Sequence, residues 1–186
     1  MWRHRPVQSA ISVTSIALAL AVATSSALAI RGNSPGSTGG SRDQNTCGAG
    51  LVWDARKNIC VQAQRGMLPD EELAEYAYAL AEEGRYREAL STLDLLEDPD
   101  TPRALNYRGF ATRKLGRLDE GISYYLKAVA LDPEYAPVRE YLGEAYVVQG
   151  RLDLAKQQLA IIESICGTRC EEYIDLAEAI EAAGDF

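Results

Sequence analysis

Four cysteines at short spacings are the residues of this chain best placed to do chemistry. They form two local pairs, Cys47 with Cys60 and Cys166 with Cys170. An even number of cysteines is typical of disulfides in a chain that is exported, as the N-terminal segment described below predicts for this one. Four cysteines allow three connectivities, and we expect the one in which both disulfides are local. Two alternatives are a zinc site made of all four thiolates and a redox pair at Cys166 and Cys170. Thioredoxin-like sites have two residues between their cysteines, whereas three separate this pair.

Histidine is the side chain whose scarcity limits the possible chemistry most. His4 is the only one, and it lies in a segment that we expect to be removed. Ser-His-Asp catalysis, Cys-His catalysis and mixed Cys/His zinc sites are then excluded. We interpret the acid pairs Asp98/Asp100 and Glu171/Glu172 as solvated charges in a loop and at a helix start. The sequence therefore predicts no enzyme activity, no cofactor and no metal site.

Residues 1–29 have the pattern of a secretory signal peptide. Arg3 and Arg5 precede a long apolar stretch, and Ala27-Leu28-Ala29 offers a cleavage site. The alternative is an N-terminal membrane anchor, because the apolar stretch is about long enough to span a bilayer. Its serine and threonine residues favour cleavage. We predict a periplasmic or secreted protein with no stable membrane insertion once the signal is removed.

The charge of the chain argues against two classes of partner. It carries 27 acidic and 19 basic residues, a net charge of −8, and loss of the signal would remove two arginines and no acid. Such a protein repels nucleic acid and anionic membrane surfaces. We therefore predict a protein or peptide partner and no nucleic acid.

Two short segments separate the signal from the main domain. Residues 30–46 are rich in glycine and serine and are predicted to be a flexible linker. Residues 47–61 place β-prone runs on both sides of a polar turn, which predicts a hairpin closed by a Cys47–Cys60 disulfide. Trp53 of this hairpin packs on the first helix in the simpler interpretation, or is exposed for a glycan or partner in the other.

A helical pattern returns three times between residues 70 and 165. Gly84, Gly116 and Gly150 mark its period, with intervals of 32 and 34 residues. A period near 34 with two helical stretches and a glycine-containing turn is the signature of a tetratricopeptide repeat. The apolar stripes predict paired helices at 70–83 and 85–96, 102–115 and 118–131, and 136–149 and 152–165. Small residues such as Gly109 and Gly143 would let these helices approach closely.

Residues 68–183 resemble the tetratricopeptide repeat family. Pro133 matches its closing proline, while Leu73, Leu105 and Arg139 stand where the family usually has tryptophan. The resemblance implies an all-α solenoid of three helix-turn-helix repeats, and we expect an amphipathic helix at 170–183 to cap it with a polar outer side. The whole layout, with its signal, linker and disulfide hairpin, resembles small exported tetratricopeptide proteins of Gram-negative, alphaproteobacterial type.

The resemblance also implies a concave groove lined by the first helix of each repeat. The residues expected to bind a partner there are Tyr78, Arg103, Asn106, Tyr107, Phe110, Arg113, Lys114, Tyr141 and Glu144. The middle of this set is basic and aromatic, which favours a short peptide with an apolar anchor and an acidic end. Alternatively, Arg113 and Lys114 pair with Glu82 and Glu144 on neighbouring helices. The carboxylate clamp of the chaperone-binding members is missing.

Two functions follow from these patterns. The first is a non-enzymatic adaptor of the periplasm or cell envelope that binds a protein or peptide through the groove. The second is a cell-wall or glycan-associated envelope protein, in which the Cys47–Cys60 hairpin is the binding element.

Overall fold

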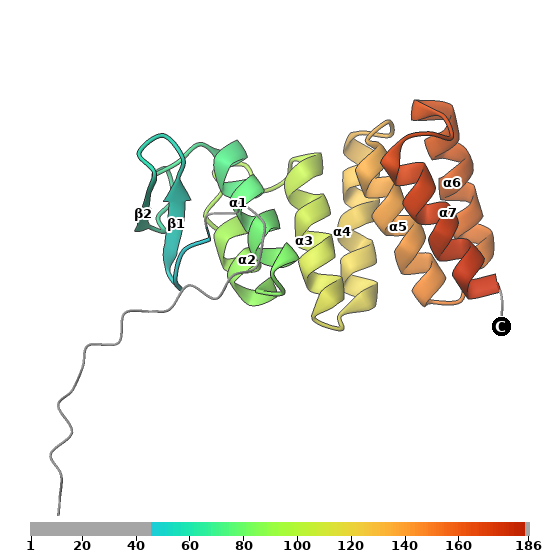
Figure 1. Ribbon diagram of the computed structural model, residues 1–186, viewed down its shortest axis with the longest axis horizontal. Coiled ribbons are helices and arrows are strands. Elements are labelled where there is room, and N and C mark those ends of the chain that lie inside the picture. Colours follow the sequence, from blue (N-terminus) through green and yellow to red (C-terminus); the bar gives the residue numbers. More distant parts are fainter. Residues whose placement is uncertain (1–45, 185–186) are drawn as a thin grey trace, which may run out of the picture. The chain divides into compact units, whose positions relative to one another are not determined.

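The computed structural model describes residues 46–184. This part of the chain forms a row of paired helices that begins with a small two-stranded sheet (Figure 1). The predicted signal peptide, and the predicted linker up to residue 45, lie outside the described residues. Among the described helices none is both long and apolar enough to cross a membrane.

The helices follow one another as three pairs and a last single helix (Figure 1). Their bounds are α1 Asp70–Glu82, α2 Tyr86–Leu93, α3 Pro102–Lys114, α4 Leu118–Leu131, α5 Ala136–Val148, α6 Leu152–Cys166 and α7 Glu171–Gly184. Each first helix packs on its own second helix, and α1, α3 and α5 also contact one another in turn. Helix α7 packs against α5 and α6, so it takes the place of a first helix in a further repeat.

The expected helix boundaries agree with the structure to within one residue, except at the end of α2. That helix ends at Leu93, three residues before the predicted end. The early end allows Leu96 to turn inward, where it is 1% exposed. The Asp70 carboxylate accepts hydrogen bonds from the backbone N–H groups of Glu97 and Asp98, at 2.9 and 2.8 Å. These hydrogen bonds therefore hold the short connection between α2 and α3 against the start of α1.

Small residues set the spacing between helices, as predicted. A Cβ atom on Gly109 would lie 2.5 Å from the ring of Tyr125, and one on Gly143 would lie 2.5 Å from the side chain of Leu176. Both distances are far below van der Waals contact, so neither position tolerates a side chain without movement. Gly143 therefore lies where α7 packs closely against α5.

Strands β1 (Leu51–Asp54) and β2 (Ile59–Gln62) form an antiparallel hairpin in which Trp53 lies opposite Cys60. Disulfides join Cys47 to Cys60 and Cys166 to Cys170, the two local pairings that the sequence predicted. The cysteines are therefore bonded, and neither the four-thiolate zinc site nor a free dithiol is formed in this structure.

The hairpin is part of the same core as the first repeat. Val52 is fully buried, and Trp53 packs half-buried against the core, in keeping with its simpler interpretation. The backbone N–H of Cys47 donates to the hydroxyl of Tyr76 at 2.7 Å, and Arg85 donates to the Cys47 carbonyl at 2.7 Å. Because a lone hairpin is only marginally stable in water, this attachment and the disulfide together hold it in place.

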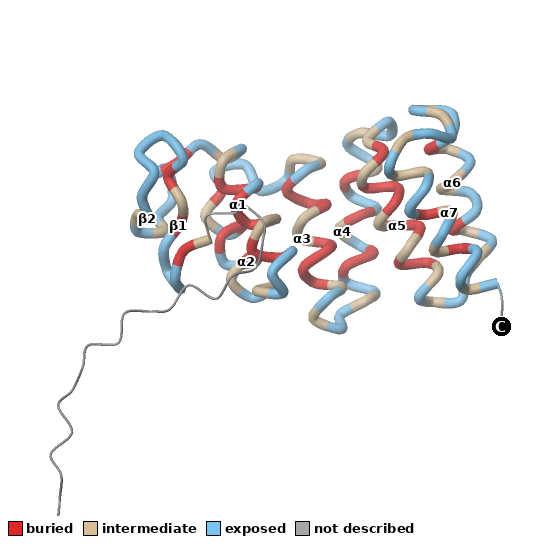
Figure 2. Tube along the Cα trace, viewed as in Figure 1, coloured by how far each residue is buried: buried red, intermediate tan, exposed pale blue. Residues whose placement is uncertain are grey.

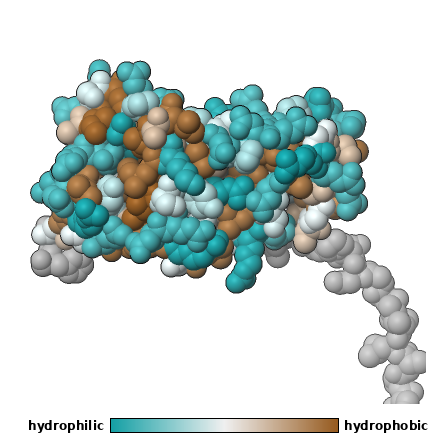
Figure 3. Space-filling model, turned by 180° about the vertical axis from the view of Figure 1, so that it is seen from behind, coloured by the Kyte–Doolittle hydropathy of each residue, from teal (hydrophilic) through white to brown (hydrophobic). Residues whose placement is uncertain are grey.

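Buried residues occur along the whole row of helices (Figure 2), and the apolar ones form two clusters. The first joins the hairpin, α1, α2 and α3, and the second joins α3 to α7. Helix α3 contributes to both, and the half-buried ring of Tyr141 packs against both. The side seen in Figure 3 is largely hydrophilic with separate apolar patches. Large exposed apolar side chains on the helices include Leu126 and Leu131 of α4.

Candidate functional site

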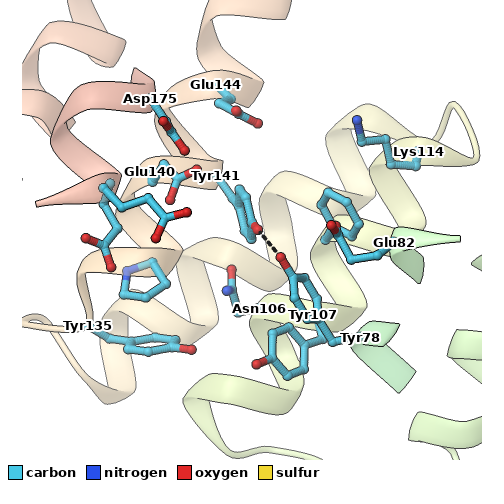
Figure 4. A pocket seen from close by; sticks show the side chains of 14 residues that line it. Tyr78, Glu82, Asn106, Tyr107, Lys114, Tyr135, Glu140, Tyr141, Glu144 and Asp175 are labelled. Atoms are coloured by element: carbon cyan, nitrogen blue, oxygen red, sulfur yellow. Dashed lines mark hydrogen bonds between the residues drawn. The ribbon is translucent and has the colours of Figure 1, made fainter. Parts of the chain in front are cut away.

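A cavity of about 480 Å³ opens between the first helices of the three repeats and α7 (Figure 4). Its lining residues recur every three or four positions on each helix, for example Asn106, Phe110 and Lys114 on α3, and Pro137 and Glu140 on α5. This spacing places them on one helix face, which is the face that the stacking of repeats leaves open.

Aromatic rings form one wall of this cavity. Tyr78 and Tyr107 stack with their centroids 4.6 Å apart, and Phe110 lies 5.2 Å from Tyr141. The hydroxyls of Tyr78 and Tyr141 are hydrogen-bonded to one another at 3.0 Å (Figure 4). Burial raises the pKa of both phenols. They therefore remain neutral at physiological pH and present polar hydroxyls beside ring faces that attract cations.

Carboxylates of α5 and α7 form the opposite side, whereas Glu82 of α1 lies beside the aromatic rings (Figure 4). Six acidic residues line the cavity and come from three helices: Glu82, Glu140, Glu144, Glu171, Glu172 and Asp175. Lys114 is the only basic residue in the lining, and its amine lies 5.3 Å from the centroid of the Phe110 ring. The site is therefore acidic and aromatic.

This acidity corrects the expectation of a basic groove that favours an acidic peptide end. Arg113 is 10% exposed, and its guanidinium forms an ion pair with Glu144 at 2.6 Å instead of facing the cavity. The second reason is α7, where the sequence predicts that Glu171 and Glu172 are solvated charges at a helix start, and where the structure leaves Glu171 exposed and Glu172 half-buried. Because α7 folds back onto α5, its residues Glu171, Glu172 and Asp175 line the cavity.

Glu140 lies deepest among these acids and is 8% exposed. Burial raises its pKa to about 8, and the negative charges of Glu144, Asp175, Glu172 and Glu171 add to the effect. A carboxyl group with this pKa carries a proton through much of the neutral range.

Asn106 is fully buried at the floor of the cavity. Neither its amide oxygen nor its amide nitrogen has a hydrogen-bond partner among residues 46–184. Figure 4 shows the side chain between Tyr107 and Tyr141. An unpaired buried amide costs about 1–3 kcal/mol of stability, and a ligand that supplied both a donor and an acceptor would recover part of that cost.

The structure brings most of the predicted site residues together. Seven of the nine line the cavity: Tyr78, Asn106, Tyr107, Phe110, Lys114, Tyr141 and Glu144. Arg113 is turned away, and Arg103 lies outside, where its guanidinium contacts Glu71 and Glu75 at 3.2 and 3.0 Å. The proposed pairing of Arg113 with Glu144 is therefore present, whereas the described residues show no ion pair between Lys114 and Glu82.

The predicted binding residues did not include the acids of α7, Tyr135 or Pro137. Glu82 and Glu140, which the resemblance implies face the groove, also line the cavity. One sequence signal could have found the α7 residues: Glu171, Glu172 and Asp175 have the spacing of groove positions on a first helix. If the helix predicted at 170–183 is interpreted as the first helix of a further repeat, and not only as a cap, these acids fall in the groove.

Comparisons with known proteins identify the class of this fold. Residues 113–164 match the family model described as tetratricopeptide repeat. The TPR repeat-containing thioredoxin TTL4 of Arabidopsis thaliana is 28% identical over 117 residues, which make up 62% of this chain. The match spans 16% of that relative.

Solved structures of other proteins, including a tetratricopeptide repeat domain, have a similar fold. One is the Yersinia enterocolitica type III secretion chaperone SycD in complex with a peptide of the translocator YopD, with 19% identity, a TM-score of 0.52, and coverage of 61% of this chain and 91% of that one. Another is the first TPR of Spaghetti (RPAP3) bound to the HSP90 peptide SRMEEVD, with 22% identity, a TM-score of 0.52, and coverage of 62% and 94%. The helical part of this chain has the fold of a tetratricopeptide repeat solenoid, with three helix pairs and a closing helix, and residues 113–164 of it match that family model.

Proposed function

We propose that this chain is an exported, non-enzymatic adaptor that holds a protein or peptide in the cavity between α1, α3, α5 and α7. The observation that carries the proposal is the joint presence of an aromatic wall and unpaired polar groups around one open cavity. Its volume of about 480 Å³ is within the range of ligand sites in proteins. The two solved structures of similar fold described above each hold a peptide, which supports the same kind of ligand here.

The chemistry of the lining supports binding rather than catalysis. The phenols of Tyr78 and Tyr141 have raised pKa values, which is the opposite of what a nucleophile or general base requires. Glu140 is the one lining carboxyl group whose pKa is raised to about 8, and its burial, followed by the charges of neighbouring acids, causes the rise. Among residues 46–184, the charged groups that act on it include no base.

Export is the part of the proposal that rests on the sequence. The two disulfides support it, because such bonds persist in oxidising compartments. Mass spectrometry of the protein made from its full sequence in a Gram-negative host tests it directly. We expect a mature chain that begins at Ile30 in the periplasmic fraction. A full-length chain retained in the membrane would favour the anchor, and one that remains in the cytoplasm would refute export.

A photo-crosslinking amino acid tests whether the cavity is the binding surface. We would place it at Glu82, which is exposed and lines the cavity, and in a control at Leu126, which is 48% exposed on α4 and lies outside the cavity lining. Neither side chain supports the core, so both variants should fold. We expect discrete adducts with envelope proteins from position 82 alone. Equal adducts from both positions, or none from position 82, would remove the groove from the proposal.

A second candidate is the cell-wall or glycan-associated protein that binds through the hairpin. It is favoured by a cavity of about 500 Å³ in which Trp53 lies beside Glu71, Glu72 and Glu75 of α1. An aromatic ring beside carboxylates is a common way to hold a sugar. Co-sedimentation with purified peptidoglycan that Trp53→Ala abolishes, while its melting temperature is retained, would support this candidate. A protein that stays in the supernatant would exclude it.

A further inference from the structure

The charge of the groove specifies its ligand more closely than the repeat fold does. Six acidic side chains and one amine line the cavity, and Arg113 neutralises only Glu144. Glu140, with its raised pKa, holds a proton at neutral pH. The other four, Glu82, Glu171, Glu172 and Asp175, have no ion pair with any lysine or arginine of residues 46–184. A cavity with this excess of negative charge attracts a cation and repels an anion.

The aromatic wall favours the same charge. Tyr78, Phe110 and Tyr141 form the aromatic wall of the cavity, and Lys114 of the chain itself already lies over Phe110 at 5.3 Å. Ring faces attract ammonium and guanidinium groups, and they also bury the apolar stem of a lysine or arginine side chain. The two walls therefore suit opposite ends of one long basic side chain.

Asn106 is an independent indication that a ligand enters. Its amide is fully buried and lines the cavity. The Tyr135 phenol lies nearby, but no group of residues 46–184 reaches the amide with the geometry of a hydrogen bond. A carboxamide offers a donor and an acceptor side by side, which matches the N–H and C=O of a peptide backbone. A free metal ion or a simple amine would satisfy at most half of that pair.

We propose that the groove binds an extended peptide segment that carries lysine or arginine next to an apolar residue. The basic group lies among the carboxylates of α5 and α7, the apolar side chain lies on the aromatic wall, and the backbone pairs with Asn106. This inference rests on the proposed adaptor function and adds the chemistry of its partner. It reverses the acidic peptide that the sequence alone favoured.

Matched peptides test the charge preference directly. Three fluorescein-labelled, end-blocked octapeptides would share a Leu-Phe centre flanked by lysines, by glutamines or by glutamates. Anisotropy titrations with the oxidised protein should show the lysine peptide binding about tenfold or more tighter than the glutamine peptide, with the glutamate peptide weakest. The advantage of the lysine peptide should shrink at high salt. Equal binding of the three peptides, or preference for the glutamate peptide, would overturn the inference.

Paired variants of α7 locate the preference in the groove. The double variant Glu172→Gln, Asp175→Asn removes two carboxylates from the lining, and the control Glu178→Gln, Glu181→Gln removes two exposed carboxylates from the same helix outside it. Both variants change the net charge equally. The first should lose about tenfold affinity for the lysine peptide and little for the glutamine peptide, while the control should match wild type. Equal losses in both variants would overturn the inference, because the preference for lysine would then follow from the net charge of the protein and not from the groove.

The two proposals fail in distinguishable ways. If position 82 captures a partner by crosslinking but the lysine peptide has no advantage, the adaptor stands and the cationic ligand is wrong. If position 82 captures nothing and no peptide binds, both proposals are wrong.

Discussion

Replacement of the buried acid Glu140 by glutamine should stabilise the protein at neutral and alkaline pH. The carboxyl group is 8% exposed and lies near Glu144 on its own helix and near Glu171, Glu172 and Asp175 on α7. Desolvation, followed by these like charges, raises its pKa from 4.5 to about 8. Glutamine has the same shape and remains neutral, so the variant removes the ionisation and leaves the packing unchanged.

The sign and the size follow from proton linkage. Between pH 4.5 and about 8 the folded protein holds a proton on Glu140 that the unfolded chain has released, so stability falls as pH rises. The loss is about 1.4 kcal/mol for each pH unit, which gives about 3 kcal/mol at pH 7 and about 4–5 kcal/mol above pH 8. Below pH 4.5 the acid is protonated in both states and contributes no difference.

Urea unfolding followed by circular dichroism at pH 5, 7 and 9 measures this effect. The difference in unfolding free energy between Glu140→Gln and wild type should be small at pH 5 and grow to several kcal/mol at pH 9. Glu178→Gln, on the exposed side of α7, controls for the loss of one negative charge. A difference that is independent of pH, or one that shrinks as pH rises, would refute the account of Glu140 as a buried acid with a raised pKa.

Three further outcomes are expected. Replacing both Cys166 and Cys170 by serine should lower the free energy of unfolding by about 2 kcal/mol, because the disulfide closes a short loop before α7. The same change should weaken binding of the lysine peptide, since Glu171 directly follows that loop. Unfolding measurements check the first effect and anisotropy measurements the second. Gly143→Ala should cost about 1–3 kcal/mol, because its Cβ would lie 2.5 Å from a side chain of α7, and a melting curve unchanged from wild type would contradict that close approach. Arg113→Met should lower the free energy of unfolding by about 3 kcal/mol, because it leaves Glu144 unpaired. Lys114→Met should change the free energy of unfolding by less than about 0.5 kcal/mol. Equal effects of the two substitutions would mean that the ion pair between Arg113 and Glu144 does not stabilise the fold.

The repeat architecture was predictable because its signals are local. The turn glycines, the apolar stripes and the small residues Gly109 and Gly143 each report on a helix and its immediate neighbour. Such signals placed most helix ends within one residue. The end of α2 was not predictable in this way, because it depends on Asp70 at the far end of α1, whose carboxylate receives the backbone of the next loop.

The electrostatic character of the groove was predicted wrongly for a similar reason. Sequence periodicity shows which side chains share a helix face, and it does not show which of them are neutralised by a neighbouring helix. Arg113 has the spacing of a groove residue but lies against Glu144. Arg139, at a position that is usually tryptophan in the family, is 7% exposed and satisfied by the Pro133 carbonyl and Gln158. In both cases the partner comes from a different segment.

Helix α7 has two roles whose requirements differ, and its sequence satisfies both. As a closing helix it needs apolar side chains against α5 and α6, which Leu176 and Ile180 supply from buried positions. A closing helix needs no particular charge on its open side beyond solubility. Yet the acids on that side lie where a first helix of another repeat would face the groove, beside the buried carboxyl group of Glu140. Carboxylates that repel one another cost stability unless a cation joins them, so their placement around one cavity is better explained by a ligand than by capping.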